Sequence, residues 1–323
     1  MVTPDLLTYE ACAGALDWAG AVEALRRGHL RPRAEIADIF LGPRTATLLN
    51  RAAFIPGLGY GVKAVTVMDG NAARGLPTVQ GAMMVYDAET GSLRAVIDSR
   101  LVTEFKTAAD SVLGARLLAR PDSRHLVIVG AGVVATSLIR AYGAIFPDLE
   151  RISVWARRPE QARALVDAAR GPAEAAGITA RLEAAPDLDA ALAEADIISS
   201  ATMARSPVIH GARVRPGTHV DLIGAFKADM READDALIGG SRLFVDSRAT
   251  TLHHIGELTM PIRAGVITEA DVLGDLYDLV PATAPARRSA DEITVYKNGG
   301  GAHLDLMIAD YIAATAAATA TTG

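Results

Sequence analysis

A glycine-rich turn between an apolar strand and a helix constrains this 323-residue chain more than any other feature. Residues 126–129 are apolar throughout, the motif Gly130-Ala131-Gly132-Val133-Val134-Ala135 follows them, and a helical pattern continues to residue 145. The first glycine permits a tight turn, and the second lets the backbone approach a pyrophosphate. The small Ala135 allows the helix to pack on the strand, and the N–H groups at the helix start face the negative charge. The motif predicts a dinucleotide-binding unit.

The segments around this motif alternate between strand-like and helix-like patterns. Strands are expected at 126–129, 151–155, 197–201, 219–223 and 243–245, and helices lie between them, notably at 159–169 and 188–195. Such alternation predicts a parallel sheet with helices on both faces, because each crossover between parallel strands needs room for a helix. We therefore expect an α/β fold with a doubly wound parallel sheet, of the Rossmann type, over residues 119–302.

The part of the chain before this motif has a different residue pattern. Residues 1–30 have a helical pattern, and a helix is also expected at 103–119, with Thr103 as its N-cap. Between them, short β-type runs are separated by Gly, Pro, Asn and Asp, and they predict one antiparallel sheet with strands at 34–40, 45–49, 60–67, 81–86 and 93–97. We assign residues 1–118 to an α+β substrate-binding and dimerisation domain with a mainly antiparallel sheet. A C-terminal helix at 303–323 is expected to pack back on it.

The composition excludes several classes of function. The net charge is −6, which argues against a nucleic-acid partner or an anionic membrane surface. Cys12 is the single cysteine, so the chain forms no internal disulfide and no Cys-rich metal site. No uncharged stretch is long enough to span a bilayer, and the N-terminus lacks the basic start of a signal peptide. We expect a cytoplasmic protein that binds no metal.

The nature of the dinucleotide depends on the end of the second parallel strand. An NAD-selective site usually has Asp or Glu at this point, whereas this chain has Ala156, Arg157 and Arg158. The two arginines could accept a 2′-phosphate, so the cofactor is NADH or NADPH, with the choice left open. Ligands in such sheets bind beyond the carboxyl ends of the strands. The remaining predicted cofactor-binding residues therefore stand at two later strand ends, and they are Ala201, Thr202, Ile223 and Gly224. Asp246 is expected either to line the same crevice or to cap the following helix.

Beyond the glycine turn, a series of ordered motifs makes the chain resemble the ornithine cyclodeaminase/mu-crystallin family over nearly its whole length. These motifs are GVKAVTV (61–67), GLPT (75–78), FKTAA (105–109), VGAG (129–132), RPGTHV (215–220), VDSR (245–248) and EITVYK (292–297). The resemblance implies a homodimer in which a Rossmann domain is joined to a substrate-binding sheet domain. It also implies cyclodeamination of ornithine or lysine, imino-acid reduction, alanine dehydrogenation, or a cofactor-binding role without turnover.

The resemblance further implies a set of substrate-binding cations. In this family three cations hold the substrate carboxylate, and the motifs place them at Arg33, Lys63 and Lys106, with Arg44 and Arg51 as competitors for the first position. Lys63 is the expected catalytic residue, which binds the carboxylate, helps to supply a proton, or both. Lys106 departs from the usual arginine, and His303 stands where an apolar residue is common in the family.

Another departure concerns the type of reaction. The cyclodeaminase branch has a catalytic aspartate where this chain has Phe226, and a phenyl ring cannot accept and return protons. We therefore expect an NAD(P)H-dependent reductase that converts a small 2-imino acid into an L-amino acid. Because the site offers more cations than one carboxylate needs, reduction of iminosuccinate to L-aspartate is the first hypothesis. The alternatives are a Δ1-pyrroline-2-carboxylate or cyclic ketimine reductase, then an ornithine cyclodeaminase or a crystallin-type binding protein.

Overall fold

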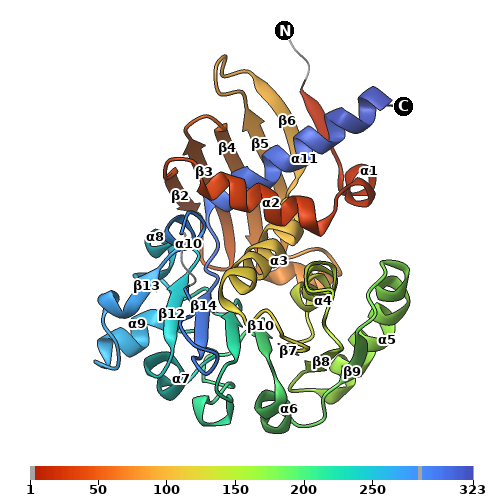
Figure 1. Cartoon of the computed structure of the whole chain (residues 1–323). Coiled ribbons are helices and arrows are strands. Elements are labelled where there is room, and N and C mark those ends of the chain that lie inside the picture. Colours follow the sequence, from red (N-terminus) through yellow and green to blue (C-terminus); the bar gives the residue numbers. More distant parts are fainter. Residues whose placement is uncertain (1–3, 283–285, 323) are drawn as a thin grey trace. The chain divides into compact units, whose positions relative to one another are not determined.

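The computed structural model describes residues 4–282 and 286–322, which form two compact units (Figure 1). Unit 1 comprises the chain up to Lys106 together with the segment from Gly301 onward, and unit 2 is Thr107–Gly300. The boundary thus lies inside helix α3 (Ser99–Leu118), whereas the sequence places it after this helix. Within the described residues, no helix is both long enough and apolar enough to cross a membrane.

Unit 1 is built on a six-stranded sheet with the strand order β1-β6-β5-β4-β3-β2. Strands β2 to β6 pair in antiparallel fashion, as expected, and their neighbours along the chain are their neighbours in the sheet. Their bounds are β2 (Glu35–Leu41), β3 (Ala46–Ile55), β4 (Gly59–Met68), β5 (Val79–Tyr86) and β6 (Leu93–Asp98). A 3-10 turn, η2 (Asp69–Arg74), follows β4.

Two sequence-based expectations for this unit are wrong. Residues 5–7 form strand β1 (Asp5–Leu7) rather than helix, and β1 runs parallel to β6, so the sheet is mixed. Three residues are too few to show an alternating pattern, and the pairing is set by the distant β6. Helix α3 begins at Ser99 rather than near Thr103, because Asp98 Oδ1 accepts a hydrogen bond from Arg100 N at the helix start.

Helices α2 (Trp18–His29) and α11 (Ala302–Thr322) pack together across the sheet of unit 1 (Figure 1). Glycine permits this contact, because a Cβ at Gly20 would lie 2.6 Å from the hydroxyl of Tyr311. On β4, alternate residues such as Gly61, Lys63 and Val65 are buried. The C-terminal helix therefore packs on the first domain, and it covers the strand that carries Lys63.

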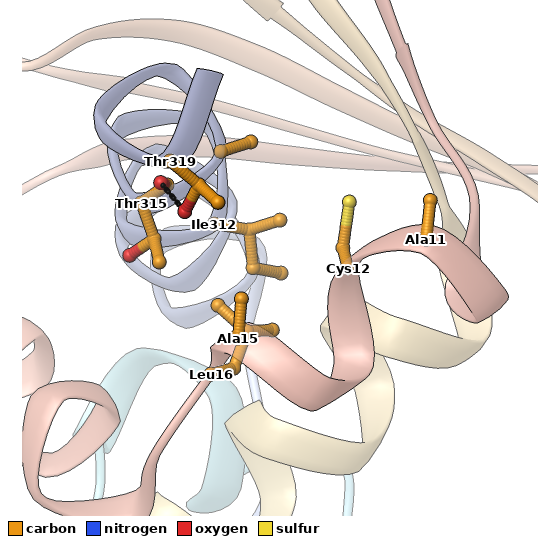
Figure 2. A pocket seen from close by; sticks show the side chains of 8 residues that line it. Ala11, Cys12, Ala15, Leu16, Ile312, Thr315 and Thr319 are labelled. Carbon is orange, nitrogen blue, oxygen red and sulfur yellow. Dashed lines mark hydrogen bonds between the residues drawn. The ribbon is translucent and has the colours of Figure 1, made fainter. Parts of the chain in front are cut away.

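A small cavity of about 180 Å³ separates α11 from α1 (Tyr9–Cys12) and the following 3-10 turn η1 (Ala13–Ala15), as Figure 2 shows. Ile312 and Thr315 line it from one side, and Cys12 and Leu16 from the other. Burial raises the pKa of the Cys12 thiol, which holds it in the neutral, weakly nucleophilic form.

Unit 2 is a parallel sheet with the strand order β13-β12-β14-β11-β10-β7-β8-β9. The strands are β7 (His125–Val129), β8 (Arg151–Trp155), β9 (Arg181–Ala184), β10 (Ile197–Ser200), β11 (His219–Leu222), β12 (Arg242–Val245), β13 (Val272–Gly274) and β14 (Thr294–Lys297). From β7 the chain first builds β8 and β9 to one side, and then β10 and β11 to the other. This reversal places a ligand crevice beyond the carboxyl ends of β7 and β10. The doubly wound fold is thereby confirmed.

The helices of unit 2 cover a sheet whose central strands are buried along their whole length. They are α4 (Val133–Ile145), α5 (Pro159–Ala175), α6 (Leu188–Glu194), α7 (Asp235–Gly239), α8 (Arg248–Thr251), α9 (Gly256–Arg263) and α10 (Leu276–Leu279), with 3-10 turns η3 (Gly211–Arg213) and η4 (Glu269–Asp271). Continuous apolar runs are typical of such strands, because helices pack on both faces. The sequence pattern missed β9, β13 and β14.

Candidate active site

The glycine turn after β7 forms an open cradle in unit 2. Gly130 has a φ of +117°, and a Cβ there would lie 2.7 Å from the Ala201 carbonyl oxygen, so only glycine fits. Gly132 is the N-cap of α4, and a Cβ on it would meet no atom within 4 Å. No side chain caps this helix, so its first N–H groups face open space. Val133 is 84% exposed, while Ala135 is fully buried against the sheet. The cradle therefore has the open backbone surface that a pyrophosphate would need.

The end of β8 carries no acid that could bind ribose hydroxyls. Ala156 is buried, Arg157 and Arg158 are exposed, and α5 begins directly at Pro159. The two guanidinium groups are therefore open to solvent at the point where dinucleotide folds contact the adenosine ribose. This arrangement accommodates a 2′-phosphate and also leaves room for an unmodified ribose.

Glu232 organises the predicted cofactor residues at the ends of β10 and β11, and sequence reasoning missed it. Its Oε1 accepts hydrogen bonds from Ser200 Oγ (2.6 Å) and from Thr202 N and Oγ1 (2.7 and 2.8 Å), and its Oε2 accepts one from Gly224 N (2.6 Å). One fully buried carboxylate thus ties the two loops together. Burial raises the pKa of Glu232, while the charge of Lys297 and these hydrogen bonds act in the opposite direction.

Further buried charges support this carboxylate. Glu257 accepts hydrogen bonds from the backbone N–H groups of Glu232 and Ala233 at 2.8 and 2.9 Å, and burial raises its pKa to about 7. Lys297 is fully buried and donates to the carbonyl oxygens of Leu222 and Asn298, both at 2.7 Å. Its positive charge lies among these carboxylates and offsets their repulsion. The loops beyond β11 and β14 are therefore fixed from within the unit.

Asp246 follows β12 and stabilises a backbone turn. Its Oδ2 accepts hydrogen bonds from Gly299 N and Gly300 N at 2.9 and 2.5 Å, and its Oδ1 accepts one from Ser247 N at 2.7 Å. The side chain is completely buried. Asp246 therefore shapes the segment after β14, and its carboxylate oxygens are used by the backbone.

Phe226 stands where the family resemblance predicts an aspartate in cyclodeaminases, so this position holds no acid. Phe226 is 51% exposed, and the Nζ of Lys227 lies 5.3 Å from the centre of its ring. The nearby Asp229 forms an exposed ion pair with Arg205 at 2.9 Å. In this structure Asp229 therefore does not replace the aspartate that the chain lacks at Phe226.

In unit 1, Lys63 forms a buried ion pair that the sequence did not indicate. Its Nζ lies 2.7 Å from Oδ1 of Asp305, and the exposed fractions of the two residues are 6% and 0%. Asp305 belongs to the first turn of α11, which places it over the buried face of β4. Burial alone would raise the pKa of Asp305, but the charges of Lys63, Lys106 and Arg51 hold it below its ordinary value.

The electrostatic neighbours of this pair include two of the other predicted substrate residues. Lys106 on α3 is buried, and its charge acts on Lys63, Asp305 and His303. His303 is buried at the start of α11 with its ring centre 5.7 Å from that of His29. Burial lowers the pKa of His303 well below its ordinary value, so the imidazole is neutral near pH 7. Lys63, Lys106 and His303 therefore share one buried region of unit 1.

Arg33, the remaining predicted cation, is exposed just before β2. Its competitor Arg51 is better placed to act beside Lys63, as the register of the sheet shows. Arg51 on β3 pairs directly with Lys63 on β4, so both side chains leave the same face of the sheet. Its guanidinium binds Asp38 with Nη2–Oδ2 at 2.8 Å. Its charge acts on Lys63, Asp305 and His303.

No metal centre is evident beside these charges. Among residues 4–282 and 286–322, no group of three or more His, Cys, Asp or Glu side chains is placed to hold a metal ion.

A dinucleotide cradle on one unit and a buried cation cluster on the other define a nicotinamide-dependent oxidoreductase that acts on small imino acids. The chain belongs to the ornithine cyclodeaminase/mu-crystallin family, whose model matches residues 55–320. The expectation from the sequence motifs is thereby confirmed.

Individual relatives are similar over nearly the full length. A Δ1-pyrroline-2-carboxylate reductase of Paracoccus denitrificans is 67% identical over 310 residues, which cover 96% of each chain. The structure of the Thermococcus litoralis Δ1-pyrroline-2-carboxylate reductase, in complex with NADH and L-proline, matches with a TM-score of 0.89 at 26% identity and covers 98% of both chains. The iminosuccinate reductase of Paracoccus denitrificans with NAD⁺ matches with a TM-score of 0.88 at 27% identity, over 98% of this chain and 97% of that one.

Proposed function

We propose that this protein is an NAD(P)H-dependent reductase of small cyclic 2-imino acids, with Δ1-pyrroline-2-carboxylate as substrate and L-proline as product. The observation that carries the choice of substrate is the pairing of charges in unit 1. Lys63 is already paired with Asp305, and Arg51 with Asp38. No described residue forms an ion pair with the buried Lys106. Lys63 and Lys106 together carry one positive charge more than Asp305 offsets, and this excess fits one substrate carboxylate, because a buried charge needs a partner. The relative at 67% identity supports the same substrate.

The chain's own residues supply binding, orientation and a proton. The ammonium groups of Lys63 and Lys106 hold the carboxylate, and the Lys63 ammonium can also donate a proton to the imine nitrogen. The nicotinamide, when bound, supplies the hydride that reduces the C=N bond. The cradle at Gly130 and Gly132, together with Ala201, Thr202, Ile223 and Gly224, would hold this cofactor. Arg157 and Arg158 are the groups whose contacts would decide between NADH and NADPH.

Iminosuccinate is the second candidate substrate. Its extra carboxylate would need a further cation, and Arg51 or Arg33 would have to exchange its present contacts to provide one. The similarity to the iminosuccinate reductase structure favours keeping this candidate. A cyclodeaminase is disfavoured by Phe226.

The exposed strand β2 points to a second copy of the chain as partner. All seven residues of this edge strand are exposed, and Ile36, Ile39, Phe40 and Leu41 among them are large and apolar. An apolar edge strand open to solvent favours association. We therefore propose a homodimer, and light scattering on the purified protein at several concentrations tests it. The cytoplasmic location is a separate proposal that follows from the sequence alone.

Oxidation of NADH and of NADPH by the purified protein tests the function. Pyrroline-2-carboxylate, oxaloacetate with ammonium, oxaloacetate alone and ornithine are compared as substrates. Turnover of the cyclic imine that far exceeds all others is the expected result. Faster turnover of oxaloacetate with ammonium, and none with oxaloacetate alone, would transfer the assignment to iminosuccinate. Inactivity with both imines would contradict the proposed enzyme and favour a binding protein.

A further inference from the structure

The ammonium of Lys63 is kept in an environment that opposes its charge. The side chain lies on β4 and is almost entirely buried, and removing an ammonium from water strongly disfavours the charged form. Arg51, its cross-strand neighbour on β3, and Lys106 on α3 add like charges. The cross-strand neighbour on β5 is the apolar Met83. Burial accordingly lowers the pKa of Lys63, and both cations act in the same direction.

Asp305 on α11 is the carboxylate that acts against these effects. Its Oδ1 contacts the Lys63 Nζ at 2.7 Å, and both side chains are buried. His303 is the other titratable neighbour on α11; it is neutral near pH 7 and so contributes no compensating charge, and His29 on α2 packs against its ring. The contact with Asp305 raises the pKa of Lys63.

The second carboxylate oxygen of Asp305 binds none of the hydrogen-bond donors described, so little besides the cations draws on the negative charge of this residue. Oδ2 is buried and has no hydrogen-bond partner among the described residues. An unsatisfied buried carboxylate oxygen costs free energy, and its presence in a folded protein therefore calls for an explanation. Because no hydroxyl or backbone N–H of the described residues binds Oδ2, the charge of Asp305 stays available to the cations around it.

We propose that Asp305 is the counter-ion that keeps Lys63 protonated in the buried substrate site, and that it thereby sets the upper pH limit of imine reduction. The second half of this inference rests on the proposed function, whereas the first half concerns the protein alone. Asp305 acts through Lys63 and is therefore a positioning residue.

The proton balance shows why this charge matters. An N–H bond of the Lys63 ammonium breaks, its electron pair stays on Nζ, and the proton forms a new bond to the imine nitrogen. The C=N π pair becomes the amine lone pair when the iminium carbon gains the hydride that a reduced nicotinamide would supply when bound, the nicotinamide being oxidised in exchange. Neutral Lys63 regains a proton from water, and the adjacent Asp305 carboxylate favours this return.

The small number of lysines makes a direct measurement possible. The whole sequence contains four of them, Lys63, Lys106, Lys227 and Lys297. Protein labelled with ¹³C at the lysine Cε should give four signals, and the Lys63→Arg variant assigns the one from Lys63. Each Cε shift is then followed against pH in the protein without cofactor or substrate.

Two variants should move the Lys63 titration in opposite directions. Asp305→Asn removes the counter-ion, so Lys63 should lose its proton at least about one pH unit lower than in the wild type. Arg51→Gln removes a like charge and releases Asp38, so Lys63 should lose its proton at a higher pH. Asp310→Asn is the matched control, because Asp310 is another aspartate of α11 and pairs with Arg94 at 2.9 Å; it should leave the Lys63 titration unchanged. An unchanged Lys63 titration in Asp305→Asn would overturn the proposal.

The pH dependence of kcat/KM for the imine tests the functional half. In Asp305→Asn the alkaline limb should move to lower pH by the same amount as the Lys63 signal, and activity should recover to within about threefold of the wild type well below the limb. A loss that is equal at every pH would mean a merely structural role and would overturn this half. If the wild-type protein reduces no imine, the proposed function fails, while the lysine titration still decides whether Asp305 is the counter-ion.

Discussion

The candidate sites of the two units are formed by different parts of the protein, backbone in unit 2 and charged side chains in unit 1. In unit 2 the nucleotide cradle consists of backbone, namely Gly130 in a left-handed conformation and the uncapped start of α4 at Gly132. In unit 1 the site consists of charged side chains from separate elements, with Lys63 on β4, Lys106 on α3 and Asp305 on α11. A backbone site depends on shape, whereas a side-chain site depends on the balance of charge. Substitutions in the two units should therefore fail in different measurements.

The largest effect is expected for Lys63→Ala. Loss of the ammonium removes a carboxylate contact and the proposed proton donor, so kcat/KM for the imine should fall by about 10²- to 10⁴-fold. Affinity for the reduced dinucleotide, measured by fluorescence titration, should stay within about twofold, because the cradle lies in unit 2. Thr66→Ala on the exposed face of the same strand serves as control. Equal losses of turnover and cofactor affinity would remove the distinction between the units.

Gly130→Ala should give the converse result. At a φ of +117°, the added Cβ would lie 2.7 Å from the Ala201 carbonyl oxygen, so the turn must shift to make room for the methyl group. Dinucleotide affinity should fall at least about tenfold, and the free energy of unfolding should fall by roughly 1 to 3 kcal/mol. Gly177→Ala separates the two causes, because Gly177 also has a positive φ, at +76°, but a Cβ there meets nothing within 4 Å. That control should lose stability alone; a matching loss of affinity in it would argue against the cradle.

Arg51 and Arg33 can be separated by their effects on KM. If Arg51 releases Asp38 and joins Lys63 and Lys106 on the substrate carboxylate, Arg51→Ala should raise KM for the imine by about ten- to 100-fold, as expected for a lost charge-assisted hydrogen bond. Arg33→Ala should then change KM by less than about threefold, in steady-state assays at saturating cofactor. The reverse order would return the third cation to Arg33.

The smallest effect is expected for Glu232→Gln. The amide keeps one acceptor oxygen but turns an NH₂ group toward backbone N–H donors, so the loops after β10 and β11 should loosen. Dinucleotide Kd should rise about three- to tenfold, while KM for the imine stays nearly constant. Glu160→Gln, an exposed change on α5, is the comparison. No change in Kd would mean that the loops hold their shape without this carboxylate.

The same contrast explains how much the sequence could predict. The candidate cradle could be predicted because its residues lie within one short motif and each meets a requirement of the backbone at that turn. Glu232 was missed because the atoms that it binds, at Ser200, Thr202 and Gly224, belong to two other loops, and no local pattern links them.

In unit 1 the lysines came from family resemblance, and their partner was missed. A signal for Asp305 was nevertheless present, since it stands between Leu304 and Leu306 in a helix that is apolar on nearly all sides. An acid in such a helix requires a buried cation. The sequence predicted Arg51 only as an alternative to Arg33, because the predicted strand ended at residue 49. Strand β3 continues beyond that residue, and its register with β4 pairs Arg51 with Lys63. Short strands such as β1 and β9 depend on pairing rather than on their own few residues.

The divided course of unit 1 along the chain has a consequence for synthesis. Its strands are made first, but α11, which packs on β4 and carries Asp305, is translated only after every residue of Thr107–Gly300. At a synthesis rate of about 5 to 20 residues per second, translation of unit 2 takes roughly 10 to 40 seconds, and unit 1 lacks its last helix for that time. During that interval unit 2 can fold as one continuous piece, while β4 has its lysine and its apolar face uncovered. The nascent sheet is then the part of the molecule most exposed to aggregation or to a chaperone.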